Sequence, residues 1–84
     1  PPVIEDLTFS FPPKTYLGPV IATIKTTSSL IKKVEITSAF GNRRTFRLTY
    51  QHPRHNLNSE EVKKLREKII KTLEEKFSAK AVVG

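Results

Sequence analysis

The chain has 84 residues and no cysteine, which excludes disulfides, thiolate catalysis and cysteine-rich zinc sites. Fifteen Lys and Arg against eight Asp and Glu give a formal net charge of +7, which is typical of proteins that bind polyanions such as RNA. No apolar run approaches the roughly 20 residues that a membrane helix needs, so we expect no membrane partner. The chain opens Pro1-Pro2 and contains no Met, from which we expect residues 1–84 to be one domain cut from a longer polypeptide.

The first 30 residues predict a strand followed by a helix. Apolar and polar side chains alternate over residues 5–11, and Pro12-Pro13 ends this strand because proline cannot donate to a ladder. The apolar face of the strand consists of Leu7, Phe9 and Phe11. Gly18-Pro19 is typical of an N-cap and first helical position, so we expect a helix from Pro19 to about Ser28, despite its many β-branched residues.

Residues 31–50 predict a β-hairpin. Its strands are Ile31–Phe40 and Arg43–Tyr50, and Gly41-Asn42 joins them as a tight turn in which both residues accept positive φ. The period of two assigns one face of each strand to the core. These core positions are Val34, Ile36 and Phe40 in the first strand, and Phe46, Leu48 and Tyr50 in the second.

The last third of the chain predicts a capped helix and a short strand. Asn58 stands three residues before Glu61, as in a capping box, and a helix follows from Ser59 to Phe77. Its apolar stripe has helical spacing and consists of Val62, Leu65, Ile69, Ile70, Leu73 and Phe77. Residues 79–83 then predict a final strand.

The order strand, helix, strand, strand, helix, strand is that of the ferredoxin-like α+β sandwich. In this βαββαβ fold, two helices cover one face of a four-stranded antiparallel sheet. The other face stays open to solvent and is the natural binding surface. Functional residues are therefore expected on that face.

Two segments resemble the ferredoxin-fold anticodon-binding domain, the C-terminal domain of the β subunit of phenylalanyl-tRNA synthetase. They are the opening PVIEDLTF at Pro2–Phe9 and TFRLTYQHPRHNLNSEEV at Thr45–Val62. The chain departs from the family at Glu5, where arginine is frequent, at Gly41-Asn42, where the connection is commonly longer, and at the end, which lacks an arginine.

The resemblance implies a module that binds the anticodon stem-loop of phenylalanine tRNA. Its partners would be that tRNA, the rest of the β chain and the α subunit of a cytoplasmic enzyme. The parent enzyme could be a bacterial two-subunit synthetase or a single-chain organellar one, and the resemblance does not distinguish the two. The parent enzyme would be a ligase that uses ATP and magnesium, whereas this chain is expected to hold no cofactor.

The candidate RNA-binding residues are polar side chains that alternate with the core positions, together with arginines in or near turns. Hydroxyls and cations of this kind suit single-stranded RNA, whose phosphates, 2′-OH groups and bases all form hydrogen bonds. The candidates are Thr8, Ser10, Lys33, Thr45, Arg47 and Thr49 on the strands, with Arg43, Arg44 and Arg54 near turns. The alternative is an ordinary polar sheet face, because Thr is a good strand residue.

We find no catalytic motif in the sequence. His52 and His55 lack a third ligand for zinc. Glu60 and Glu61 could be paired catalytic carboxylates, but their position at the start of a capped helix accounts for them better. An RNA-recognition motif would need aromatic residues on the open face, whereas Phe9, Phe11, Phe46 and Tyr50 are in phase with the core. An acylphosphatase-like enzyme would need a phosphate-cradling loop, which residues 12–16 do not supply. A structural or protein-interaction domain with incidental basic charge stays as the alternative.

Overall fold

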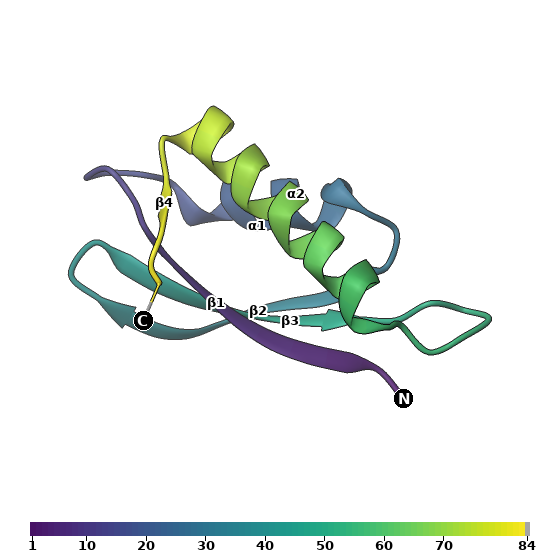
Figure 1. Ribbon diagram of the computed structural model, residues 1–84. Coiled ribbons are helices and arrows are strands. Elements are labelled where there is room, and N and C mark those ends of the chain that lie inside the picture. Colours follow the sequence, from purple (N-terminus) through teal and green to yellow (C-terminus); the bar gives the residue numbers. More distant parts are fainter. Residues whose placement is uncertain (84) are drawn as a thin grey trace.

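The computed structural model describes residues 1–83 and has the expected order of six elements (Figure 1). The strands are β1 (Val3–Ser10), β2 (Ile31–Phe40), β3 (Arg43–Tyr50) and β4 (Lys80–Ala81), and the helices are α1 (Leu17–Thr27) and α2 (Ser59–Phe77). All strand pairs are antiparallel, in the order β2-β3-β1-β4, and both helices lie on one side of the sheet. The ferredoxin-like sandwich is therefore confirmed.

The core lies between the sheet and the two helices. The stripe of α2 is buried at Val62, Leu65, Ile69 and Leu73, as its spacing predicts. It covers the inner side chains of β1 and β3, of which Phe9, Phe46, Leu48 and Tyr50 are among the largest fully buried residues. Burial of one such side chain contributes about 1.5–3 kcal/mol, so this layer is the main source of stability. Neither helix within residues 1–83 has the length and apolar character needed to cross a membrane.

The bounds of α1 differ from the prediction. The helix begins at Leu17 with Tyr16 as its N-cap, so Gly18-Pro19 lies within the first turn. Proline is tolerated there because the first four N–H groups of a helix have no intrahelical acceptor. The β-branched residues are accommodated because Val20 and Ile24 are buried and the hydroxyl of Thr23 donates to the carbonyl of Pro19 at 2.8 Å.

The other boundary differences are small. β1 begins at Val3 rather than Glu5, and β4 has only two residues instead of the five expected over residues 79–83. The capping box at the start of α2 is confirmed, since the Asn58 side chain accepts from the Glu61 N–H at 2.8 Å and the Glu61 side chain accepts from the Asn58 N–H at 3.1 Å.

The predicted alternation of β2 fails at two β-bulges, between Ile31 and Lys33 and between Ile36 and Ser38. A bulge inserts one residue without a partner, so each one reverses which side chains face the core. The first brings Ile31 into the core at 6 % exposure. The second turns Phe40 out, where it is 82 % exposed, so the assignment of Phe40 to the core was wrong.

The β2–β3 turn is tied to its surroundings. Of its two residues only Gly41 has positive φ, at 57°, which matches a type II′ hairpin turn rather than the expected positive φ at both positions. The carbonyl of Asn42 accepts the N–H of Phe11 at 2.8 Å, which anchors the hairpin to the segment after β1.

Candidate nucleic-acid interface

The sheet side away from the helices, here called the open face, carries the candidate residues of the strands. Directly opposed residues of antiparallel strands project to the same side, so the register defines this face. It includes Ile4, Asp6, Thr8 and Ser10 of β1, Lys33, Glu35, Ser38 and Phe40 of β2, Arg43, Thr45, Arg47 and Thr49 of β3, and Lys80 of β4.

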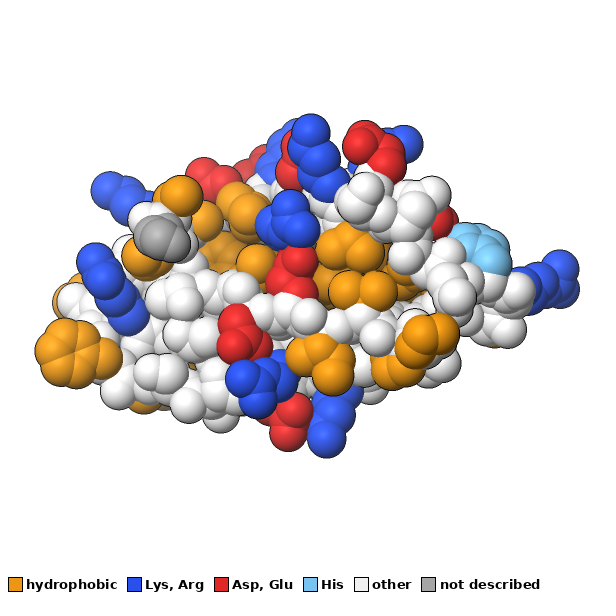
Figure 2. Space-filling view, turned by 60° about the horizontal axis from the view of Figure 1, so that its bottom comes forward, with side chains coloured by type: hydrophobic (Ala, Val, Ile, Leu, Met, Phe, Trp, Pro, Cys, Tyr) orange, Lys and Arg blue, Asp and Glu red, His pale blue; other side chains and the backbone are white. Residues whose placement is uncertain are grey.

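The centre of the open face holds charges that pair with one another. The Arg47 guanidinium donates two hydrogen bonds to the Asp6 carboxylate, Nε to Oδ1 at 2.9 Å and Nη2 to Oδ2 at 3.1 Å. This contact lowers the pKa of Asp6 and raises that of Arg47. Lys33 lies 3.5 Å from Glu35. Basic and acidic side chains accordingly lie together in the lower middle of Figure 2. Two of the predicted RNA-binding cations are therefore compensated by carboxylates.

Hydroxyl groups lie beside this charged centre. Thr8 and Thr45 are opposed in the register, and their Oγ1 atoms are 2.7 Å apart. Thr49 is opposed to Ile4 on one side and to Lys33 on the other. The structure thus brings the predicted hydroxyl residues onto one surface, where they can exchange hydrogen bonds with a bound ligand.

The hairpin end of the open face differs from its centre. One row crosses all four strands there, since Phe40 is opposed to Arg43, Arg43 to Ser10, and Ser10 to Lys80. Within residues 1–83, neither Arg43 nor Lys80 forms a salt bridge. The row therefore joins uncompensated cations to an exposed aromatic ring. At the left of Figure 2, hydrophobic and basic side chains likewise lie side by side.

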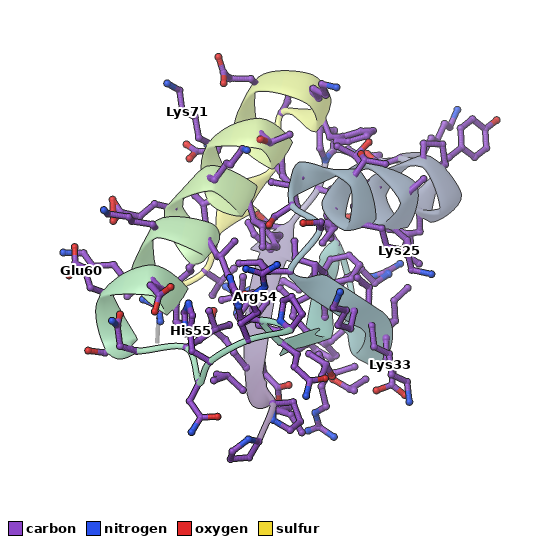
Figure 3. All side chains as sticks on the ribbon, turned by 90° about the vertical axis from the view of Figure 1, so that its right-hand side faces the viewer. Lys25, Lys33, Arg54, His55, Glu60 and Lys71 are labelled. Carbon is purple, nitrogen blue, oxygen red and sulfur yellow. The ribbon has the colours of Figure 1, made fainter. Side chains whose placement is uncertain are left out.

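Arg44 and Arg54 are not part of this surface. Arg44 is in phase with Phe46, so it lies on the helix side of the sheet. Its Nη1 donates to the carbonyls of Gly41 at 2.8 Å and Arg43 at 2.7 Å, which stabilises the turn. Arg54 lies in the loop between β3 and α2, which projects from the end of the molecule opposite the hairpin turn (Figures 1 and 3). The nine candidates thus do not form one site.

A sequence model of the ferredoxin-fold anticodon binding domain matches residues 1–81. The chain belongs to this family. No match was found among curated proteins. Membership assigns the anticodon-binding domain a tRNA partner and a role in the aminoacyl-tRNA synthetase family.

Glu5, which stands where the family frequently has arginine, points toward the helices and binds side chains there, a contact that the sequence did not predict. Its carboxylate accepts two hydrogen bonds from Arg66 of α2, from Nε at 3.1 Å and Nη2 at 2.8 Å, and a third from the Tyr50 hydroxyl at 3.1 Å. Burial first, and then the negative charge of Glu5, raise the pKa of Tyr50. The sequence did contain a signal for this orientation. Glu5 stands two residues before Leu7, so the period of two places it on the same side of β1 as Leu7 and Phe9, facing the helices.

The histidines of the β3–α2 loop contact each other rather than a third ligand. Their rings stack with centroids 3.9 Å apart, and the backbone N–H of Arg54 donates to Nδ1 of His52 at 3.0 Å. His55 Nε2 lies 3.8 Å from Glu61 Oε2. No group of three or more side chains in residues 1–83 is placed to hold a metal ion. The loop geometry of this anticodon-binding domain is accounted for by local hydrogen bonds and stacking.

Proposed function

We propose that the chain binds the anticodon stem-loop of phenylalanine tRNA as a module of a cytoplasmic phenylalanyl-tRNA synthetase. The observation that carries the proposal is the open face, a sheet surface of hydroxyls with uncompensated cations at its hairpin end. Support for phenylalanine in particular comes from the likeness of Pro2–Phe9 and Thr45–Val62 to the domain of the β subunit.

The chain supplies binding and orientation, and the chemistry takes place elsewhere in the parent enzyme. Amino-acid activation with ATP and magnesium is assigned to the rest of that enzyme. The β chain and the α subunit are then the protein partners. The domain contributes by holding the anticodon end of the tRNA, so that the acceptor end is presented in a fixed orientation.

The open face suits an RNA loop for chemical reasons. Threonine hydroxyls donate and accept, so Thr8, Thr45 and Thr49 can contact 2′-OH groups and base edges. Arg43 and Lys80 supply charge for phosphates, because each has no carboxylate partner within residues 1–83. Arg47 retains N–H groups that do not contact Asp6, so it can still donate to RNA while paired. Phosphate contact by Arg54 stays a prediction, because this residue lies in the β3–α2 loop at the other end of the molecule.

The test is an NMR titration of the isotopically labelled chain with the anticodon stem-loop of phenylalanine tRNA at low salt. We expect shifts on β1, β2 and β3, concentrated on open-face residues, and weaker binding of a stem-loop with a different anticodon loop. Binding should fall steeply with salt, since phosphate contacts release counterions. Absence of shifts on these strands would refute the proposal and favour a protein-interaction domain. Equal binding of both stem-loops would refute the assignment to phenylalanine tRNA alone.

A further inference from the structure

The hairpin end of the open face has the composition of a nucleotide-binding subsite. Its row consists of Phe40, Arg43, Ser10 and Lys80 and crosses the sheet from one edge to the other. Neighbouring strands are about 4.8 Å apart, so the row is roughly 14 Å long. Stacked nucleotides rise about 3.4 Å each, so the row can contact a few nucleotides of a single strand.

The β-bulge before Ser38 is the reason that an aromatic residue lies on this face. Without it, Phe40 would share the side of Val34 and Ile36 and face the helices. With it, Phe40 is opposed to Arg43, and its ring is 82 % exposed. Bulges are often found next to functional sites, where they redirect a side chain.

We infer that Phe40, Arg43 and Lys80 form a subsite for an unpaired nucleotide. The Phe40 ring stacks on the base, and the two cations contact the flanking phosphates. Aromatic stacking accepts any base, because every base has a π face, while the cations follow the backbone. The subsite therefore binds loop nucleotides without reading their sequence. This inference rests on the proposed function, since it specifies which part of the RNA the hairpin end holds.

Tyr16 provides an internal control for Phe40. It is also an exposed aromatic residue, at 81 %, but it lies at the N-cap of α1 in the helix layer. It belongs to none of the rows of the open face. If any exposed ring bound RNA by chance, the two positions would behave alike.

The test uses tryptophan as a reporter, because the chain has none of its own. The variants Phe40→Trp and Tyr16→Trp are titrated with the phenylalanine tRNA anticodon stem-loop, and the fluorescence of each tryptophan is followed. Stacking on a base should quench the emission of Phe40→Trp and leave that of Tyr16→Trp unchanged. Equal responses at the two positions would overturn the stacking assignment.

Affinity measurements by anisotropy complete the test. Phe40→Ala should weaken binding roughly 5- to 150-fold, the range for loss of one stacked base, whereas Tyr16→Ala should not. The salt slope is the steepness with which the logarithm of the binding constant falls with the logarithm of the salt concentration. Arg43→Gln combined with Lys80→Gln should lower it by about 1.4, or about 0.7 for each phosphate. Circular dichroism checks that the variants are folded, which we expect because both aromatic rings are exposed.

The outcomes separate this subsite from the proposed function. If the unmodified chain binds the stem-loop and Phe40→Ala binds equally well, the subsite is refuted and the proposed function stands. If an unrelated stem-loop binds as tightly and Phe40→Ala weakens both, the subsite stands and the assignment to phenylalanine tRNA fails. If the unmodified chain binds no RNA at low salt, both are refuted.

Discussion

Glu5 and Asp6 are consecutive residues of β1, and each holds an arginine through two hydrogen bonds, but on opposite sides of the sheet. Glu5 pairs with Arg66 toward the helices, and Asp6 pairs with Arg47 on the open face. In the Glu5–Arg66 pair, here called the inner pair, the carboxylate side chain is 15 % exposed. In the Asp6–Arg47 pair, here called the outer pair, it is 44 % exposed. The same chemistry therefore operates in two different surroundings.

The difference shows how one strand serves both stability and binding. The inner pair connects α2 to β1, and loss of either partner would leave a poorly solvated charge or hydroxyl. The outer pair is well solvated, and such pairs contribute little to stability. Its effect is to reduce the charge that Arg47 presents to RNA, which leaves the hairpin end as the more strongly cationic part of the face.

The largest expected effect comes from breaking the inner pair. Arg66→Ala should lower the free energy of unfolding by about 2 kcal/mol, less than the 3–5 kcal/mol of a fully buried pair because Arg66 is 38 % exposed. The melting temperature should fall by roughly 8–16 °C. Urea unfolding measures the change, and Lys64→Ala on the exposed side of α2 is the control. Equal midpoints for the two variants would show that the inner pair does not stabilise the fold.

Tyr50→Phe should have a smaller effect, about 1 kcal/mol at neutral pH, because only one hydrogen bond to Glu5 is lost. The effect should depend on pH. Burial raises the pKa of Tyr50, so above the ordinary pKa of about 10 the unfolded chain loses the Tyr50 proton while the folded chain retains it. The stability that this proton provides is present below about pH 10 and is lost as pH rises further.

Urea unfolding as a function of pH tests this prediction. The stability advantage of the unmodified chain over Tyr50→Phe should shrink above about pH 10. Tyr16→Phe is the control, since Tyr16 is exposed and its removal should leave the alkaline loss intact. A constant difference between the unmodified chain and Tyr50→Phe over this pH range would contradict the assignment.

Breaking the outer pair should change RNA binding more than stability. Asp6→Asn removes the carboxylate that holds Arg47, so binding should tighten and the salt slope should increase by about 0.7, one phosphate contact on a single strand. Glu60→Gln changes the net charge equally, but at the start of α2, away from the open face. If both variants tighten binding to the same extent, net charge alone is responsible and Arg47 has no specific role.

The sequence predicted the fold because several local signals agreed. The stripe and capping box of α2 and the alternation in β1 and β3 are regular patterns with one structural solution each. The open-face candidates on those two strands followed directly from the alternation. Thr8, Thr45 and Thr49, for example, all lie where the period of two places them.

What the sequence did not predict depends on irregularity and on distance. Phe40 was assigned to the wrong side because nothing in the residues around Thr37 marks a bulge, and one inserted residue reverses every position after it. The Glu5–Arg66 pair joins residues 61 positions apart, and periodicity specifies faces but not partners. For the same reason Arg47 was placed on the open face while its pairing with Asp6 was missed.

The smallest expected effect concerns the titration of Asp6. The hydrogen bonds from Arg47 lower the pKa of this carboxyl group, so its midpoint, followed by carboxyl ¹³C NMR, should lie below the ordinary value of about 3.9. Arg47→Gln should return it toward that value. The depressed pKa means that any stability from the pair is present above about pH 3.9 and is lost as pH falls through the folded-state midpoint. Arg47 would then be paired at any pH near neutrality, where RNA binding is measured. An ordinary midpoint in the unmodified chain would mean that the outer pair is open in solution, and all the N–H groups of Arg47 would then be free to contact RNA.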